Sequence, residues 1–199
     1  MLERRVTTAD CALGVAIPLS DDVFWAQAQD PERHELARMW AEQDLEIWQE
    51  TVRSVREACD MARARGASVV LDLRLADLAE LLRTRPVVAV LAHYRVTPTF
   101  ALELSDGFVS HDSLLDVVPP GYDGVLDLSS CYGVDLAEAI KRKAPDSRIM
   151  LTKGGTSPVL VAWRFETVLE HLQRAPAPYT DLVVAITEAL IRTRAPQRT

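Results

Sequence analysis

Residues 123–140, DGVLDLSSCYGVDLAEAI, decide the fold class of this chain. An apolar run over 124–130 reaches Cys131, the chain turns at Gly133, and a helical pattern begins at Val134. A strand followed directly by an amphipathic helix is the building unit of α/β proteins. Sites in such proteins form just beyond the carboxyl ends of the strands, so Cys131 stands where a reactive thiol would be useful.

The same alternation of strands and helices continues through most of the chain. It predicts an α/β fold, a three-layer sandwich whose mainly parallel sheet has helices on both faces. The expected strands are residues 11–19, 67–73, 86–93, 124–130 and 147–152. The expected helices in the second half of the chain are residues 75–84, the segment after Cys131, residues 157–173 and residues 179–193.

Two other segments carry clear local signals. Asp30 followed by Pro31 is typical of a helix start, and Gly66 is typical of a helix stop. The helix between them would run through about 35 positions, which is long enough to expect a kink or a break. Residues 100–115 alternate around Asp106-Gly107, which predicts a hairpin.

Composition predicts one soluble domain that spans residues 1–199. The chain is 48% hydrophobic and 26% charged, and no apolar run approaches the roughly 18–20 residues that a membrane span needs. The net charge of −7 argues against nucleic acid as a partner. The start of the chain lacks the apolar core of a signal peptide, and the three cysteines form neither a disulfide framework nor a metal-binding pattern. We therefore expect a cytoplasmic protein with no membrane partner, no cofactor and no metal.

Two of the expected strands end in residues that are capable of nucleophilic catalysis. Residues 86–93 end in His93, and residues 124–130 lead to Cys131. If these strands are neighbours, both side chains lie at the same edge of the sheet. A thiol needs a base or a nearby positive charge to ionise at neutral pH, and a histidine and the following helix would supply both. The pattern predicts a His-Cys dyad, although each residue alone is also compatible with a packing role.

The remaining cysteines and histidines are expected to have structural or surface roles. Cys11 opens an apolar strand and Cys59 lies on the apolar stripe of a helix, so both are expected to pack in the core. His34 is expected to be solvated in the first turn of a helix, and His171 to lie on the surface. His111 follows the Asp-Gly turn and could approach the edge that carries His93.

Three short motifs resemble the CHAT branch of caspase-like peptidases, which have the caspase–hemoglobinase fold. These are AHY at 92–94, LELSDGFVSHDSLL at 102–115 and SSCYGVDLAEAI at 129–140, in that order and spacing. The resemblance is strongest over residues 67–173. It implies a caspase-like domain and a cysteine peptidase that acts on protein substrates. It also implies that His93 acts as base or acid, that Cys131 is the nucleophile, and that the backbone N–H groups of Tyr94 and Cys131 bind the oxyanion.

Two residues depart from the pattern of this family. Tyr94 stands where the family has a glycine that helps to form the oxyanion hole, and Ser130 precedes the cysteine. Residues 94–100, YRVTPTF, read as a mobile loop beside the site, and residues 152–157, TKGGTS, read as a second loop. We therefore expect the chain alone to be nearly inactive until a regulatory protein partner orders the site. By analogy with the family, this would be a proteolytic switch in bacterial stress or defence.

Two alternatives remain open at this point. Tyr94 in place of glycine favours a catalytically inactive caspase-like module that binds other proteins. An unrelated α/β amidohydrolase that uses Cys131 would fit the strand ends but not the hairpin.

Overall fold

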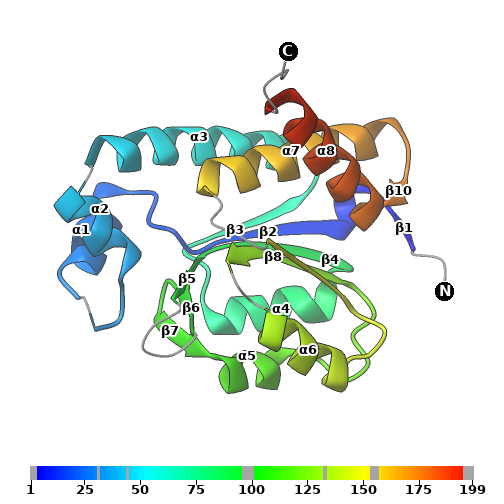
Figure 1. Cartoon of the computed structure of the whole chain (residues 1–199), viewed down its shortest axis with the longest axis horizontal. Helices are drawn as coiled ribbons and strands as arrows, with labels where there is room; N and C mark the ends of the chain where they lie inside the picture. Colours follow the sequence, from blue (N-terminus) through cyan, green and yellow to red (C-terminus); the bar gives the residue numbers. More distant parts are fainter. Residues whose placement is uncertain are drawn as a thin grey trace, which may run out of the picture.

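The computed structural model describes residues 4–30, 32–43, 45–95, 101–131, 134–152 and 157–194, and for residues 43, 129–131, 134, 135, 152, 193 and 194 it describes the backbone alone. A five-stranded sheet, with every neighbouring pair parallel, forms the centre of the molecule (Figure 1). In their order across the sheet the strands are β3 (Ser68–Leu71), β2 (Cys11–Val15), β4 (Val87–Leu91), β8 (Val125–Cys131) and β9 (Arg148–Thr152).

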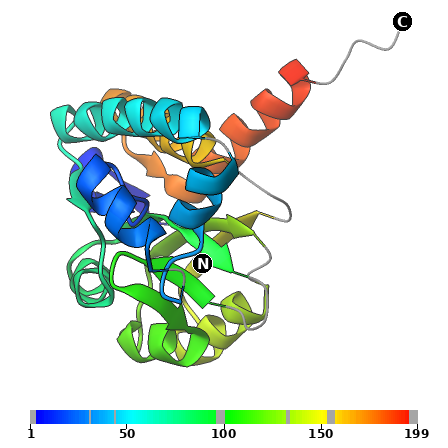
Figure 2. The same ribbon diagram turned by 90° about the vertical axis from the view of Figure 1, so that its left-hand side faces the viewer.

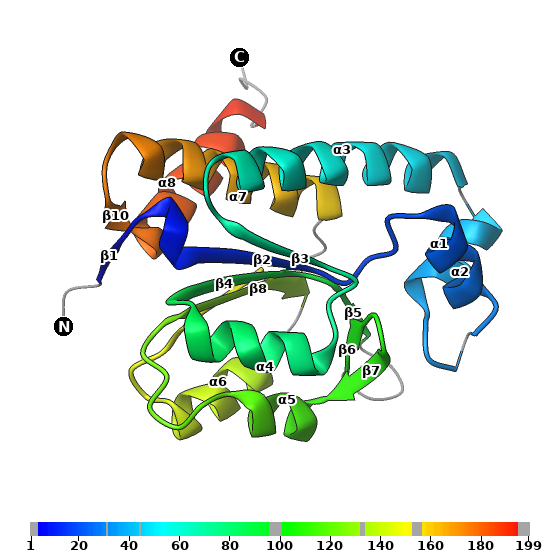
Figure 3. The same cartoon turned by 180° about the vertical axis from the view of Figure 1, so that it is seen from behind.

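Helices cover both faces of this sheet, so the predicted three-layer sandwich is confirmed (Figures 1 and 3). On one face lie α3 (Leu45–Ala64), α7 (Pro158–Arg174) and α8 (Tyr179–Arg194). On the other lie α4 (Leu75–Thr84), α5 (His111–Val117) and α6 (Val134–Lys143). All five strands end at the same side of the sheet, which we call the carboxyl edge.

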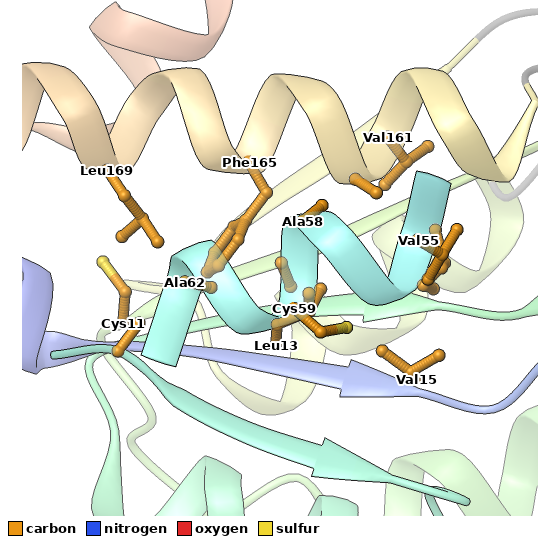
Figure 4. Packing of buried hydrophobic residues seen from close by; sticks show 14 of the residues in the cluster. Cys11, Leu13, Val15, Val55, Ala58, Cys59, Ala62, Val161, Phe165 and Leu169 are labelled. Atoms are coloured by element: carbon orange, nitrogen blue, oxygen red, sulfur yellow. The ribbon is translucent and has the colours of Figure 1, made fainter. Parts of the chain in front are cut away.

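Each face of the sheet has its own hydrophobic core because side chains alternate along a strand. In β2, Cys11, Leu13 and Val15 pack toward α3 and α7, whereas Ala12 packs toward the opposite layer. Figure 4 shows the first core between β2 and the two helices. Its labelled members are Cys11, Leu13, Val15, Val55, Ala58, Cys59, Ala62, Val161, Phe165 and Leu169. Cys11 and Cys59 are therefore packing residues, as predicted.

The helical region before β3 differs from the prediction of one helix that starts at Asp30. The structure has α1 (Asp21–Ala28), which was not predicted, then α2 (Leu36–Gln43) and α3. The Ser20 side chain caps α1, and the Asp30 carbonyl closes a turn by accepting the N–H of His34 at 2.9 Å. Asp30 thus opens the turn that connects α1 to α2 instead of starting a helix. α2 ends at Gln43 and α3 begins at Leu45, and residue 44, where the expected break would fall, lies outside the described residues. Gly66, with φ of +86°, follows the end of α3.

The strand predicted at 86–93 is divided in two. β4 ends at Leu91, and β5 (His93–Arg95) joins a separate antiparallel sheet with β6 (Ala101–Leu104) and β7 (Gly107–Ser110). The hairpin predicted at Asp106-Gly107 is confirmed, but residues 111–115 belong to helix α5. The β5–β7 sheet and the helices α1 and α2 lie at the same end of the central sheet (Figure 2).

Three short elements complete the fold. β1 (Arg5–Val6) pairs with β10 (Ala177–Pro178), and η1 (Thr8–Asp10) leads into β2. Within the described part of the chain, no helix has the length and apolar character that crossing a membrane requires.

A buried ion pair joins β8 to the helices above it. The Asp127 side chain is 1% exposed and accepts hydrogen bonds from Arg164 Nη2 at 3.0 Å (Oδ1) and 2.9 Å (Oδ2). The Tyr179 hydroxyl donates to the same carboxylate at 3.0 Å. Burial, together with the Asp127 charge, raises the pKa of Tyr179 well above its ordinary value, so the phenol stays protonated as a donor. These contacts hold the middle of β8 against α7 and α8.

Replacing Arg164 by leucine should destabilise the protein by about 3–5 kcal/mol, because the Asp127 charge would stay buried without its guanidinium. The double variant Asp127→Asn, Arg164→Leu should recover part of this loss. Urea unfolding measures both effects.

The matched control is Arg192→Leu, which removes an exposed ion pair with Glu188 on α8. We expect a change within about 0.5 kcal/mol for this variant. A loss of under about 1 kcal/mol for Arg164→Leu would contradict a structural role for the buried pair.

Candidate functional site

Adjacent parallel strands bring the chain that follows β4, which includes His93, and the end of β8, at Cys131, to the same edge of the sheet. The two strands are adjacent and parallel, and the last of their paired residues are Ala89 and Asp127. Beyond this pair the register is not continued, because His93 belongs to β5 and β8 has an irregularity between Asp127 and Cys131. The predicted adjacency of the two strands is thus confirmed. The backbone of Cys131 ends β8, whereas its side chain lies outside the described part of the chain.

A bulge lies in β8 immediately before Cys131. Asp127 pairs with Met150 of β9 and Cys131 pairs with Thr152, so β8 advances four residues while β9 advances two. Such bulges bend a strand and redirect its side chains, and they are common beside active sites. Helix α6 begins three residues after Cys131, and the partial positive charge at its amino end lies close to the end of β8.

His93 faces a carboxylate from the segment that precedes α2. His93 Nε2 lies 3.7 Å from Glu35 Oε2, and the His93 side chain is 25% exposed. The Glu35 Oε2 atom is shielded from solvent and has no hydrogen-bond partner among the described residues. The imidazole therefore has an acidic neighbour on one ring nitrogen, and Nδ1 is left to face another group.

A second carboxylate holds this segment in place. Glu103 is the direct cross-strand partner of His93, and its side chain is buried. Its Oε2 accepts the backbone N–H groups of Glu35 at 3.1 Å and Leu36 at 3.2 Å. Glu103 thus caps the amino end of α2 from another element, where a negative charge is favourable.

The prediction that His34 is solvated was wrong. The residue is 5% exposed, and its Nδ1 lies 3.4 Å from Glu103 Oε1. The physical reason is that the backbone of Glu35 and Leu36 is bound by Glu103 of β6. His34 is therefore held against β6 and is not on a solvent-facing side of a helix. His171 is exposed, as predicted.

Tyr94 packs away from His93, as alternation along β5 requires. Its side chain is buried in the core on the α4–α6 face, and its hydroxyl hydrogen-bonds His111 Nε2. The two rings are stacked with their centroids 5.9 Å apart. His111 therefore contacts the far side of β5. The oxyanion role of the Tyr94 and Cys131 N–H groups stays a prediction, and residues 96–100, 132, 133 and 153–156, which include parts of both predicted loops, lie outside the described residues.

Sequence reasoning did not find Glu35 or Glu103. One signal was present for Glu103, because a carboxylate in the apolar strand ALEL, at 101–104, needs a buried partner. Nothing local marks Glu35, since the histidine that it contacts is far away in sequence.

The two described cysteines are poor nucleophiles. Burial raises the pKa of Cys11 to about 12 and that of Cys59 to about 11. Both thiols therefore stay protonated at neutral pH, and only the thiolate attacks electrophiles.

Comparisons with known proteins leave the family of the chain open. No family model matches it, and no curated protein matches it. Among solved structures, a flavodoxin from the domain Archaea is similar, with 11% sequence identity and a TM-score of 0.32. That match covers 83% of this chain and 99% of the flavodoxin. A likeness at this level carries no conclusion about function.

Replacing Glu35 by glutamine should change the tautomer of His93. The carboxylate favours the ring form with the proton on Nε2, because that nitrogen lies 3.7 Å from the negatively charged Oε2 atom, whereas the amide of glutamine carries no charge. We expect the tautomer ratio to shift by about two- to fivefold, the range for a partly exposed charge contact. Imidazole ¹⁵N chemical shifts measure this ratio in alkaline buffer, where histidine side chains are neutral.

Glu32→Gln is the matched control, because Glu32 is an exposed carboxylate of the same segment. It should leave the His93 shifts unchanged. Identical His93 shifts in the Glu35→Gln and unsubstituted proteins would mean that Glu35 does not orient the ring.

Proposed function

We propose that the chain is a cysteine endopeptidase in which Cys131 attacks a peptide carbonyl and His93 transfers the protons. The observation that supports this proposal is that β4 and β8 are adjacent and parallel, so that the chain after β4, with His93, and the end of β8, at Cys131, leave the sheet at the same edge. The resemblance to caspase-like peptidases assigns the same two residues. The free, buried thiols of Cys11 and Cys59 accord with a reducing compartment such as the cytoplasm.

The chemistry needs one thiol and one imidazole. Cys131 Sγ forms a bond to the carbonyl carbon while its proton moves to His93, and the carbonyl oxygen becomes an oxyanion. The N–H groups of Tyr94 and Cys131 would bind this oxyanion. Collapse breaks the C–N bond as His93 gives its proton to the leaving amine. Water then adds to the thioester, His93 takes a proton from that water, and collapse releases the carboxylic acid and restores the thiol.

Glu35 would act here as a positioning residue. A carboxylate on one ring nitrogen of a catalytic histidine holds the ring in place and stabilises the imidazolium that forms in each step. Glu35 lies at Nε2 of His93, so Nδ1 would face Cys131. Glu103 accepts the backbone N–H groups of both Glu35 and Leu36. These hydrogen bonds fix the segment that carries the Glu35 carboxylate.

We also propose that a regulatory partner controls this activity. Tyr94 is anchored by its contact with His111, so a rotation that aims its N–H at an oxyanion needs β5 to shift against the core. Loss of one oxyanion donor costs about 10²–10³ in rate, which would keep the chain nearly silent. The same anchoring of Tyr94 favours the second candidate, a catalytically inactive module that binds other proteins.

Labelling with iodoacetamide tests the dyad without needing fast turnover. In the native protein, Cys131 should react first, and Cys11 and Cys59 should react only after unfolding, since their pKa values are raised by burial. His93→Ala should slow the labelling of Cys131 about tenfold or more, because the thiolate loses its partner. Peptide mapping by mass spectrometry gives the rate at each cysteine.

His171→Ala is the control, since His171 is an exposed histidine on α7. It should leave all three rates unchanged. Two results together would favour the inactive module. Cys131 would be labelled at the same rate with and without His93, and the protein would show no peptide cleavage that depends on Cys131.

A further inference from the structure

The exposed apolar side chains of this protein are concentrated on one side of the sheet. Of the eight exposed large hydrophobic side chains in the described part of the chain, seven belong to α1, α3, α7 or α8 and one to β3. Among the described residues, α4, α5 and α6 on the opposite face carry none. A single exposed apolar residue is ordinary, whereas a concentration on one layer marks a surface that meets another molecule. The seven side chains are Trp25, Leu45, Ile47, Met61, Trp163, Val184 and Ile191.

Helix α8 shows this exposure most clearly. Its buried residues Tyr179, Val183 and Ile186 lie in its first half, and its carboxyl-terminal part rises above α3 and α7 (Figures 1 and 2). Ile191, in this raised part, is 65% exposed. Most of the stability of a helix in a protein comes from packing of its apolar face. A surface that covers Ile191 would therefore stabilise the end of α8.

The charge of the chain is distributed as unevenly as its apolar surface. Residues 20–50 contain nine Asp and Glu against two Arg, so their net charge of −7 equals that of the whole chain. Within them, residues 42–50, which we call the acidic stretch, have four acidic residues and no basic one. Residues 189–199, which we call the arginine stretch, have three arginines and no acidic residue. The two stretches are of opposite charge and would attract one another.

The apolar residues accompany these charges. Leu45 and Ile47, in the acidic stretch, are exposed at the start of α3, and Ile191, in the arginine stretch, is exposed near the end of α8. The start of α3 lies close to α1 and α2, whereas the end of α8 rises above the other end of α3 (Figures 1 and 3). The start of α3 and the end of α8 thus do not meet within one molecule.

A second copy of the chain can bring them together. If two copies pack face to face with their α3 helices antiparallel, the end of α8 in each copy lies over the start of α3 in the other. A two-fold contact of this kind uses the same surface of both copies and closes as a dimer. It makes both charge contacts at once, and it covers the exposed apolar side chains of the layer.

We propose that the outer face of α3, α7 and α8 is a two-fold interface between two copies of this chain. The end of each α8 lies against the acidic stretch of the other copy, where Ile191 is covered together with Ile47. Trp163 of α7 is buried in the same interface. The contact needs neither His93 nor Cys131, so it goes beyond the proposed activity and does not rest on it.

Two charge-swap variants test this interface. The first is Glu46→Arg, Gln49→Arg, Glu50→Arg, at three exposed positions of α3. The second is Arg194→Glu, Arg198→Glu, which leaves the ion pair between Arg192 and Glu188 in place. Each variant alone puts like charges at both contacts, so its self-association should weaken at least about tenfold.

Analytical ultracentrifugation in low salt measures the association. The unsubstituted protein, loaded at about 100 µM to populate even a weak complex, should sediment as a dimer, and added salt should weaken it. An equimolar mixture of the two variants should form a one-to-one dimer, because each substituted stretch then meets a stretch of opposite charge. Ile191→Asp should weaken the dimer without unfolding the chain, since this side chain is exposed within one copy.

The matched control is Asp116→Arg, Glu138→Arg, which reverses two exposed carboxylates of α5 and α6 on the opposite layer. It should dimerise as the unsubstituted protein does, and circular dichroism should show that all variants keep their helices. An unsubstituted protein that stays monomeric, or a mixture of the two swap variants that stays monomeric, would overturn the proposal. Assemblies larger than a dimer in the mixture would contradict the closed two-fold contact.

Discussion

Parallel pairing of β4 with β8 determines where both strands leave the sheet, and the candidate site depends on this register. The pairing runs as far as Ala89 and Asp127, where the Asp127 carboxylate is bound by Arg164 and Tyr179. A buried charge of this kind is costly unless it is fully paired, so it permits few alternative positions of β8 against α7 and α8. The bulge that follows Asp127 then carries the chain to Cys131.

A chain of backbone contacts builds the rest of the carboxyl edge. Ala16 N–H donates to Leu91 O at 2.8 Å, and Leu73 N–H donates to Val15 O at 2.9 Å. Leu73 packs so closely on Gly14 that a Cβ there would lie 2.6 Å from its Cδ2 atom. This contact explains the glycine in a buried strand, where glycine otherwise weakens pairing. It also holds Leu73 against β2 at the point where the chain leaves β3.

The sequence predicted those elements of the fold that are marked by a pattern of neighbouring residues. Apolar runs gave the five central strands, the Asp-Gly turn gave the β6–β7 hairpin, and Gly66 marked the end of α3. Asp30 and Pro31 gave the wrong helix start, because Glu103 caps α2 instead of a neighbour in sequence. In an α/β fold the parallel strands all end at the same edge of the sheet. The positions of His93 and Cys131 at that edge could therefore be expected from the fold class.

The remainder of the site depends on contacts between distant segments, which no local pattern records. Glu35 reaches His93 only because α1 and α2 fold over the β5–β7 sheet (Figure 2). Arg164 likewise reads as a polar position of α7, whereas in the fold it crosses to Asp127.

Disulfide trapping tests the central claim, that the pairing of β4 and β8 brings position 93 next to Cys131. A disulfide needs Cα atoms within about 7 Å of one another, so the variant His93→Cys can bridge to Cys131 only if the two positions are neighbours. Arg85→Cys, which precedes the other end of β4, is the control. Mild oxidation of His93→Cys should give a 93–131 disulfide in the peptide map of the intact monomer, and Arg85→Cys should give none. The account would be contradicted if His93→Cys stayed fully reduced at positions 93 and 131. It would also be contradicted if the 93–131 disulfide formed no more readily than an 85–131 disulfide in the control.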